Sequence, residues 1–249
     1  DDVESRGLGD VYKRQVLITG ATSGIGHATA LAFAKAGYDL LVCARRLEVL
    51  ENMKAEFEPE YGIKVTPFAL DVTDRKAVSE ILPAVIEKAG GVDILVNNAG
   101  LAQGLDPFQE SSIDDIELMI NTNVKGLLYV SRTVLPFMLA KNAGHIINLG
   151  STAGIYAYAK GAVYCATKAA VKTLSDGIRI DTIESDIKVT TIQPGIVETP
   201  FSEVRFHGDK EKAAAVYAGV EALQAEDIAE IIVSVSYTHL RAHETRRHL

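Results

Sequence analysis

The sequence predicts an α/β fold, in which a doubly wound parallel sheet carries helices on both faces and forms three layers in one domain. Six short apolar runs alternate with longer segments whose apolar residues recur at helical spacing. The runs are continuously apolar, which is typical of strands buried on both faces of a parallel sheet. No Gly/Ser linker, charge block or repeat marks a second domain. The 249 residues, 47% of them hydrophobic, suffice for one core without disulfides.

Each element follows from these criteria in chain order. Strands are expected at residues 16–19, 40–43, 65–70, 94–96, 145–149 and 189–192. Helices are expected at residues 25–36, 47–57, 75–88, 114–141 and 162–184. Ligands of such sheets bind beyond the carboxyl ends of the strands, so the residues that follow each strand are candidates for a site.

The two ends of the chain differ from the rest. Residues 1–15 and 235–249 have no readable period and resemble translated sequencing-adapter sequence, so we expect them to be non-native ends of a domain over residues 16–234. The alternative is that the last residues form a basic tail that binds a metal or an anion. Its histidines are His239, His243 and His248.

Composition excludes several classes of function. A formal net charge of −8 argues against binding to a nucleic-acid backbone. No apolar run reaches the roughly 18 residues of a membrane span, so a soluble, cytoplasmic protein is expected. Cys43 and Cys165 lack the spacing of zinc ligands, so no metal site is predicted, and unpaired cysteines indicate a reducing compartment.

A glycine-rich turn follows the first strand and opens the first helix. Gly20, Gly24 and Gly26 lie at offsets of four and two. Glycine lets the backbone approach a pyrophosphate, and a helix N-terminus offers free N–H groups and the positive end of its dipole. Because the spacing is not G-x-G-x-x-G, an ordinary strand-to-helix turn remains the alternative.

Two arginines follow the second strand. An NAD-binding protein places a carboxylate here for the ribose hydroxyls, whereas this chain has Arg45 and Arg46. A guanidinium can bind a 2′-phosphate, so NADP(H) is predicted over NAD(H). Alternatively, both arginines are solvated residues at a helix start.

Polar residues also follow the third and fourth strands. Asp71, next to Val72, could accept a hydrogen bond from an adenine amino group, or it could cap the helix that starts near Asp74. Asn97 and Asn98 could meet a ligand or tie neighbouring strands together.

Tyr164 and Lys168 form the most informative pair. They lie at i and i+4 of a predicted helix and therefore share a face. A nearby ammonium favours phenolate, which would bring the tyrosine pKa towards the range useful for acid/base catalysis. Ser151, after the fifth strand, could polarise a substrate carbonyl. Asn123 could hold a water that links Lys168 to solvent, or it could bond to backbone as a helix-interior amide.

With these motifs in this order, and with Pro194 and Gly195 leading to Thr199, residues 16–234 resemble a short-chain dehydrogenase/reductase. The resemblance implies a Rossmann sheet of order 3-2-1-4-5-6-7, whose last strand this sequence is expected to lack. It also implies roles for Tyr164 as acid/base, Ser151 as carbonyl polariser, Lys168 as ribose binder and Asn123 as water holder. The candidate cofactor contacts are Gly20, Thr22, Ser23, Gly24, Ile25, Gly26, Arg45, Arg46, Asp71, Val72, Asn98, Tyr164, Lys168, Pro194, Gly195, Val197 and Thr199.

Further similarity to the NADP-dependent 3-hydroxy acid dehydrogenase group, which oxidises serine, allo-threonine and related acids, lies in residues 101–107, 123–129, 197–209 and 212–217. Such a substrate needs a cation for its carboxylate, and Arg205 is the candidate, beside Ser151 and Tyr164. Alternatively, Arg205 is a solvated surface residue. Residues 157–161 depart from the group's proline- and glycine-rich pattern, which leaves the pocket wall open. The alternatives are a 3-oxoacyl thioester or general carbonyl reductase, and a non-catalytic NADP-binding protein or inactive fragment. Relatives commonly form homotetramers through the helices that carry Asn123 and Tyr164.

Overall fold

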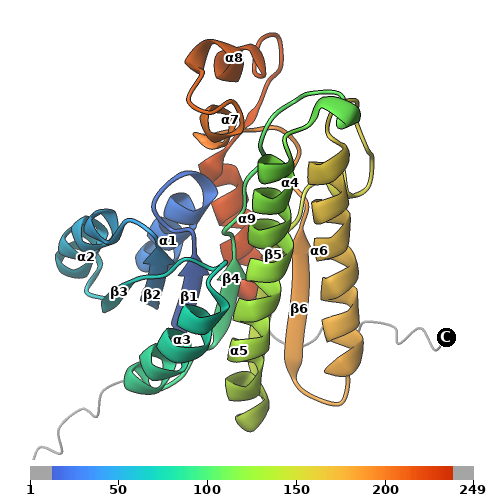
Figure 1. Cartoon of the computed structure of the whole chain (residues 1–249). Coiled ribbons are helices and arrows are strands. Elements are labelled where there is room, and N and C mark those ends of the chain that lie inside the picture. Colours follow the sequence, from blue (N-terminus) through green and yellow to red (C-terminus); the bar gives the residue numbers. More distant parts are fainter. Residues whose placement is uncertain (1–12, 238–249) are drawn as a thin grey trace, which may run out of the picture.

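A six-stranded parallel sheet forms the centre of the computed structural model, which describes residues 13–237 (Figure 1). The strand order β3-β2-β1-β4-β5-β6 confirms the predicted doubly wound arrangement. The strands are β1 Gln15–Thr19, β2 Asp39–Ala44, β3 Val65–Ala69, β4 Ile94–Asn97, β5 Gly144–Leu149 and β6 Ile187–Ile192. Every residue of β1 is buried, as expected of a central strand with both faces covered.

The order of the strands reverses beside β1. This strand pairs with β2 on one side and with β4 on the other, so the chain leaves the sheet in opposite directions from β1 and from β4. The crevice at such a reversal is where doubly wound sheets bind ligands. At the sheet edge, β3 contains Pro67, a residue that strands tolerate at edges because it donates no ladder hydrogen bond.

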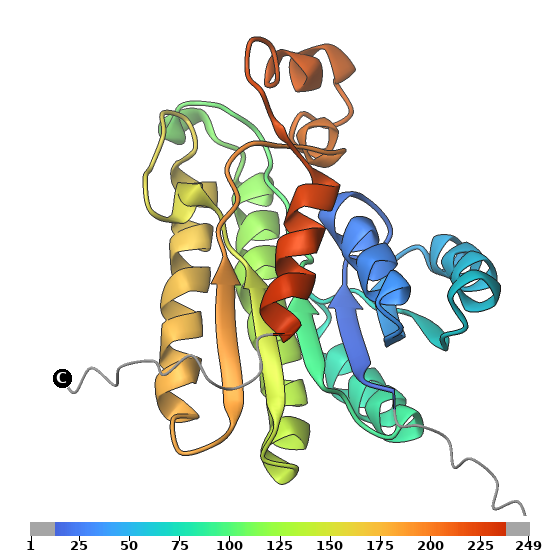
Figure 2. The ribbon, with the colours of Figure 1, turned by 180° about the vertical axis from the view of Figure 1, so that it is seen from behind.

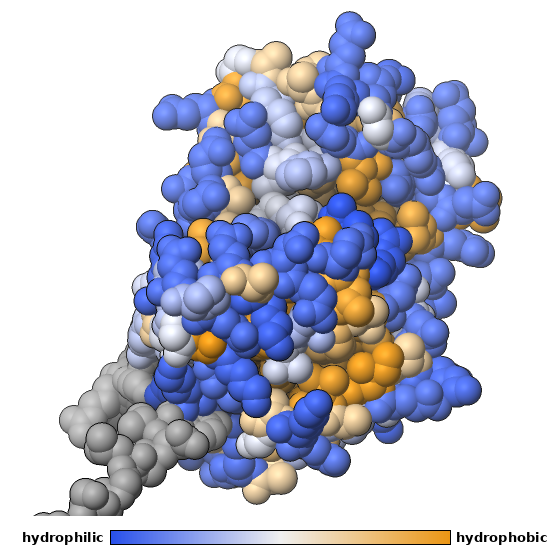
Figure 3. Space-filling view, turned by 90° about the vertical axis from the view of Figure 1, so that its left-hand side faces the viewer, coloured by the Kyte–Doolittle hydropathy of each residue, from blue (hydrophilic) through white to orange (hydrophobic). Residues whose placement is uncertain are grey.

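Helices cover both faces of the sheet (Figure 2). One layer consists of α1 Gly24–Lys35, α2 Leu47–Tyr61 and α9 Ala225–Tyr237, and the other of α3 Arg75–Ala89, α5 Leu127–Ala140 and α6 Ala162–Asp181. Each layer has its own apolar core against the sheet, with Phe33 and Phe57 in one and Leu82 and Met138 in the other. On the side of the molecule that faces the viewer in Figure 3, hydrophilic side chains predominate and apolar ones gather towards one edge.

The helix expected over residues 114–141 is present from Ile113 to Ala140, but it is not α-helical throughout. α4 Ile113–Ile120 and α5 are joined by a π-helical turn, η2 Asn121–Gly126. Two close contacts explain the turn. Asn123 is buried and bonds to the backbone of Leu101, and a Cβ at Gly126 would lie 2.7 Å from Val72. The wider turn therefore aims the Asn123 amide inward and brings the helix backbone against Val72.

The chain between β6 and α9 was not assigned to elements from the sequence. Residues 194–224, called here the roof segment, lie above the carboxyl ends of the strands (Figures 1 and 2). The segment contains β7 Val197–Glu198, α7 Phe201–Arg205, α8 Lys210–Ala215 and β8 Leu223–Gln224. β7 and β8 pair in a small sheet of their own, which closes the segment on itself. Two short 3₁₀ turns, η1 Phe108–Glu110 and η3 Thr152–Gly154, complete the structure on this side.

Regular structure continues slightly past the predicted domain limits. β1 begins at Gln15, and α9 runs to Tyr237, whose ring meets Tyr38 at a centroid distance of 5.8 Å. The limits at 16 and 234 stay a prediction, and the tail histidines lie outside the described residues. Within residues 13–237, no helix is long and apolar enough to cross a membrane.

Candidate active site

The glycine turn between β1 and α1 leaves no space for a side chain at Gly26, where α1 begins. Gly20 and Gly24 have φ angles of +67° and +53°. A Cβ on Gly26 would lie 2.3 Å from the Gly20 carbonyl oxygen and 2.4 Å from Nδ2 of Asn98. The start of α1 therefore packs directly on the turn. Ser23 precedes the helix without a side-chain capping bond, and the first turn contains no acidic residue. Thr22 and Ile25 complete the predicted loop, which has the form of an anion cradle.

Asn98 supports this turn from the neighbouring strand. Its Nδ2 donates to the carbonyl oxygens of Thr19 and Gly20, both at 3.0 Å. The adjacent Asn97 donates to Ser131 and to Asn148 at 2.9 and 2.8 Å, which ties β4 to α5 and β5. The strand-tying interpretation of Asn97 therefore holds. The side-chain donors of Asn98 are also used within the protein, in holding the turn.

The two arginines after β2 lie beside the glycine turn. Both side chains are exposed, and Nη2 of Arg46 donates to the Thr22 hydroxyl at 3.0 Å. A guanidinium has five N–H donors, so this one bond leaves Arg46 able to bind an anion above the turn. The structure thus brings the predicted phosphate-binding cations and the cradle together.

Asp71 does not cap α3. The N-cap is Asp74, which accepts from the Ala77 amide at 3.0 Å. Asp71 instead accepts from the amide and hydroxyl of Thr73, at 2.9 and 2.8 Å. The hypothesis that Asp71 caps α3 is therefore wrong, whereas the hypothesis that it contacts an adenine stays a prediction. The next residue, Val72, is buried and packs against Gly126.

Tyr164, Ser151 and Lys168 come together where β5 ends beside α6. Ser151 hydrogen-bonds to the Tyr164 phenol and accepts from the Ala153 amide at 3.1 Å. The Lys168 ammonium is buried, 5.9 Å from the centroid of the Tyr164 ring, and donates to the Leu149 carbonyl at 2.7 Å. The structure therefore confirms the shared helix face.

The pKa of Tyr164 moves opposite to the sequence expectation. Burial raises it to about 12, although the Ser151 hydrogen bond and the Arg205 charge act in the other direction. The prediction that Lys168 lowers the pKa of Tyr164 was wrong for this arrangement. The ammonium donates to the Leu149 carbonyl, and burial disfavours its charged form. Burial lowers the pKa of Lys168 to about 8. Tyr164 is thus a phenol at neutral pH, the protonation state of an acid.

Asn123 has both side-chain groups occupied. Its Nδ2 donates to the Leu101 carbonyl at 2.7 Å and to the Thr167 hydroxyl at 3.1 Å, and its Oδ1 accepts from the Leu101 amide at 2.8 Å. The side chain therefore bonds to backbone, as the alternative reading expected. It fixes the loop after β4 against α6, one residue from Lys168. The water-holding role stays a prediction.

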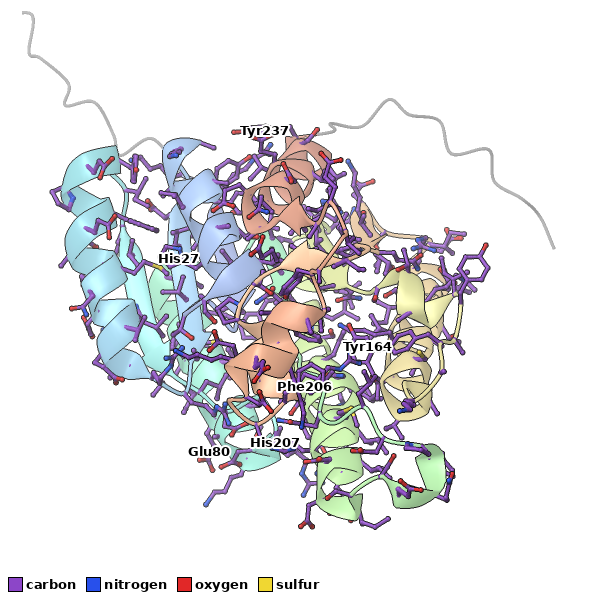
Figure 4. All side chains as sticks on the ribbon, turned by 90° about the horizontal axis from the view of Figure 1, so that it is seen from above. His27, Glu80, Tyr164, Phe206, His207 and Tyr237 are labelled. Atoms are coloured by element: carbon purple, nitrogen blue, oxygen red, sulfur yellow. The ribbon has the colours of Figure 1, made fainter. Side chains whose placement is uncertain are left out.

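A cleft opens above Tyr164. It encloses about 410 Å³, including the solvent at its mouth, between the loop after β4, α4, the start of α6 and α7. Charged side chains of both signs line it, namely Asp106, Asp115, Lys160 and Arg205. Figure 4 shows Tyr164 on the side of α6 that faces the roof segment, where Phe206 and His207 follow α7. The guanidinium carbon of Arg205 lies 5.4 Å from the Tyr164 ring centroid.

The roof segment contacts each part of the site. The Pro194 carbonyl accepts from the Thr152 amide at 3.0 Å, and a Cβ on Gly24 would lie 3.3 Å from Thr199. The Gly104 amide donates to the Arg205 carbonyl at 2.9 Å. Gly195 is exposed, and Val197 belongs to β7. The predicted residues 194–199 therefore lie between the glycine turn and the cleft.

Three residues in or beside the cleft were not named as site residues from the sequence. The Phe201 ring meets Tyr164 edge to face at 5.7 Å, Tyr158 contacts Arg205, and Gln103 lies in the cleft wall. The departure at residues 157–161 was a signal for Tyr158. Gln103 and Phe201 lie in segments that resemble the 3-hydroxy acid dehydrogenase group, but their contacts depend on how the roof segment and the loop after β4 fold over the site.

Comparisons with known proteins agree with this geometry. The family model described as short chain dehydrogenase matches residues 14–210. The chain belongs to the short-chain dehydrogenase family. Among its relatives, an NADP-dependent 3-hydroxy acid dehydrogenase of Schizosaccharomyces pombe is 45% identical over 221 residues, which cover 88% of this chain and 85% of the relative. The NADP-dependent 3-hydroxy acid dehydrogenase YdfG of Escherichia coli strain K12 is also 45% identical, over 89% of this chain and 88% of its own.

Solved structures resemble the whole fold. The closed form of serine dehydrogenase complexed with NADP+ has a TM-score of 0.86 and 45% identity, covering 90% of this chain and 89% of that chain. Serine dehydrogenase from Escherichia coli has a TM-score of 0.76 and 40% identity, covering 90% and 91%. The family inferred from the motifs is therefore confirmed, and the chain is an oxidoreductase of CH–OH groups.

Proposed function

We propose that this short-chain dehydrogenase transfers a hydride between NADP(H) and the 3-hydroxyl or 3-keto group of a small hydroxy or amino acid, of the serine, allo-threonine or 3-hydroxypropionate type. Relatives named for NADP-dependent 3-hydroxy acid dehydrogenation support the class. The observation that carries the substrate assignment is Arg205. Its guanidinium lines the cleft beside Tyr164, and its Nε is buried without a hydrogen-bond partner within the described part of the chain.

The residues present fit NADP. The glycine cradle tolerates no side chain at Gly26, and Arg46 stands beside it with donors to spare. A 2′-phosphate would find cations there in place of the carboxylate that selects NAD. The nicotinamide, when bound, supplies or accepts the hydride. The remaining candidate contacts, from Asp71 to Thr199, are proposed for the cofactor from the resemblance to the family.

The protein's own groups handle the proton. In the reductive direction, the Tyr164 hydroxyl donates a proton to the carbonyl oxygen of the substrate, and Ser151 donates a hydrogen bond to that oxygen. Tyr164 carries the proton for this step at neutral pH, because its pKa is raised to about 12. In the oxidative direction, Tyr164 must accept the proton. This requires a lower pKa, which a cation moved closer to the phenol would provide. Lys168 and Arg205, already near its ring, are the cations of this site.

The cleft offers one partner to each polar group of a small acid. A substrate carboxylate can accept from the unpaired Nε of Arg205. Oε1 of Gln103 is also buried without a hydrogen-bond partner in the described residues, and it can accept from an amino or hydroxyl group. Buried unpaired donors and acceptors are unfavourable, so filling both favours substrates with a group of each kind.

A substrate panel with NADP+ tests the proposal. Serine, allo-threonine and 3-hydroxypropionate are compared with acetoacetyl-thioester reduction, for the protein and for its Arg205→Ala variant. We expect oxidation of the acids, and a higher KM for them in the variant. A thioester reductase would instead prefer the acyl thioester and be indifferent to Arg205→Ala.

Tyr164→Phe tests the catalytic assignment. The change removes one hydroxyl from a partly buried ring, so we expect NADPH to bind while turnover is lost by at least about 10²-fold, the lower range for general acid/base groups. NADPH titration by fluorescence and single-turnover assays measure the two effects. Retained turnover would overturn the role of Tyr164. Binding without turnover in the unaltered chain would favour a non-catalytic NADP-binding protein or an inactive fragment.

Assembly into a homotetramer is proposed from the apolar side chains exposed on α4, η2 to α5, and α6. They include Ile113 (67% exposed), Leu128 (37%) and Ile180 (64%). Exposed apolar side chains on neighbouring helices are typical of subunit interfaces. Size-exclusion chromatography with light scattering tests this state, and a monomer would refute it.

A cytoplasmic location is also proposed, because a reducing compartment suits the free Cys43 and Cys165.

A further inference from the structure

We infer that Tyr158 is a positioning residue, which holds the Arg205 guanidinium over the cleft and thereby sets the preference for carboxylate substrates. The inference rests on the proposed function of Arg205 as carboxylate partner. Tyr158 belongs to residues 157–161, the segment that departs from the pattern of the group this chain resembles.

Tyr158 contacts the guanidinium in two ways. Nη2 of Arg205 donates a hydrogen bond to the Tyr158 hydroxyl. The guanidinium carbon also lies 5.6 Å from the Tyr158 ring centroid, close to its 5.4 Å from the Tyr164 ring. Both distances are within the range of cation–π attraction. Arg205 is therefore held between the loop that precedes α6 and the catalytic tyrosine, although Tyr158 is 47 residues away in sequence.

Tyr158 stands behind Arg205 and outside the cleft. Arg205, Tyr164, Lys160 and Gly161 line the cleft, whereas Tyr158 is absent from its wall. A substrate in the cleft would meet the guanidinium and not the phenol. The hydroxyl of Tyr158 takes one N–H of Nη2, and the buried Nε–H has no partner in the described part of the chain. The bond to Tyr158 thus orients the group and leaves a donor free for a carboxylate.

The Tyr158 ring is itself fixed. A Cβ at Gly161 would lie 2.1 Å from Cε2 of Tyr158, so the ring packs directly on the glycine backbone. The Gly161 amide donates to the Tyr158 carbonyl at 3.2 Å, which closes a turn through Lys160 at φ +65°. Gly161 in turn precedes α6, the helix of Tyr164. The ring therefore has a defined place relative to the catalytic phenol.

The backbone of Arg205 is fixed as well, by the bond from the Gly104 amide. A free arginine side chain has many rotamers, and ordering it on binding opposes affinity. Tyr158 orders the guanidinium before the substrate arrives. Loss of its hydroxyl should therefore raise the KM for carboxylate substrates and leave the chemical step nearly unchanged.

Tyr158→Phe is the direct test, because it keeps the ring and removes only the hydroxyl. The matched control is Tyr156→Phe, a phenol of the same loop that is 76% exposed. KM and kcat are measured for 3-hydroxypropionate and for 1,3-propanediol, which lacks the carboxylate, with NADP+ saturating. We expect Tyr158→Phe to raise the KM for the acid about three- to tenfold, the range for a typical hydrogen bond. The acid's kcat, the KM for the diol, the KM for NADP+ and the control variant should stay within twofold.

Arg205→Ala separates this inference from the proposed function. If it raises the KM for the acid and Tyr158→Phe does not, Arg205 binds the carboxylate without help from Tyr158, and the inference fails alone. If Arg205→Ala leaves the KM unchanged, the carboxylate assignment fails first. In the Arg205→Ala background, Tyr158→Phe should add nothing. An additional effect there, or an equal rise for the acid and the diol, would mean that Tyr158 acts on the pocket in general and would overturn the inference. NADPH titration of each variant confirms that it is folded.

Discussion

Gly26→Ala is the sharpest test of the cradle, because the contacts of the added methyl can be worked out. The new Cβ would lie 2.3 Å from the Gly20 carbonyl oxygen and 2.4 Å from Nδ2 of Asn98. Atoms cannot approach so closely, so α1 must move away from the turn or the Asn98 amide must leave it. The second course breaks two bonds of 3.0 Å, from Asn98 to Thr19 and to Gly20.

The expected size follows from these two terms. Loss of the two hydrogen bonds would cost about 1 kcal/mol each, and displacement of α1 by overpacking would cost about 1–3 kcal/mol, so either course costs up to about 3 kcal/mol. A destabilisation of about 3 kcal/mol lowers the Tm of a chain this long by about 6–12 °C. Thermal unfolding followed by circular dichroism measures it. NADPH titration should show weaker binding as well, because the displaced atoms form the turn itself.

The matched control is Gly177→Ala. Gly177 lies inside α6, and a Cβ there would have nothing within 4 Å. Alanine in an open helix position stabilises by about 0.5–1 kcal/mol relative to glycine, so the Tm should rise by about 1–4 °C. The two variants add the same methyl to a glycine and are expected to have opposite effects. If Gly26→Ala were as stable as the unaltered chain and bound NADPH equally well, the geometry of the turn would be refuted.

Two further predictions concern charge. Removing both cations in Arg45→Ala/Arg46→Ala should raise the KM for NADP+ by about tenfold or more while changing that for NAD+ little, since only NADP+ carries the 2′-phosphate; an equal change for both cofactors in steady-state assays would contradict the cofactor assignment. Lys168→Met should stabilise the fold at pH 7 by up to about 3 kcal/mol, which corresponds to the lowering of the lysine pKa from 10.5 to about 8. Lys168 holds its proton up to about pH 10.5 in the unfolded chain and only to about pH 8 in the folded chain. The free energy of unfolding of the unaltered chain is therefore lower than that of the variant by the full amount below pH 8, and this difference shrinks between pH 8 and 10.5. Urea unfolding of both proteins across this window measures the difference, and a gap that stayed constant with pH would contradict the burial of a charged lysine.

The sequence predicted those parts of the site that depend on local pattern. Tyr164 and Lys168 share a helix face because their spacing of four residues sets it. The glycine turn and the arginines were placed together because both follow strands of one parallel sheet, whose carboxyl ends meet at one edge. Apolar runs located all six strands of the main sheet.

Features that depend on distant contacts were beyond the sequence. The π-helical turn at Asn123 exists because Leu101 and Val72 press against it, and neither neighbour can be inferred from helical period. The Arg205 guanidinium lies near the rings of Tyr158 and Tyr164 only because the roof segment folds over α6. The direction of the Tyr164 pKa required knowledge of its burial, because the neighbouring charge alone suggested the opposite sign.

The site is built from groups that folding by itself does not favour. Lys168 is buried with its pKa lowered, Tyr164 is partly buried with its pKa raised, and Nε of Arg205 is buried without a partner in the described chain. Each would be relieved by an apolar or smaller residue, as the stabilisation expected for Lys168→Met illustrates. Tyr164 and Arg205 line one cleft and Lys168 lies 5.9 Å from the Tyr164 ring centroid, so an anionic ligand with a carbonyl or hydroxyl bound there would compensate these terms together. This concentration of unfavourable terms therefore supports placing the chemistry at the cleft, independently of the motifs that first indicated it.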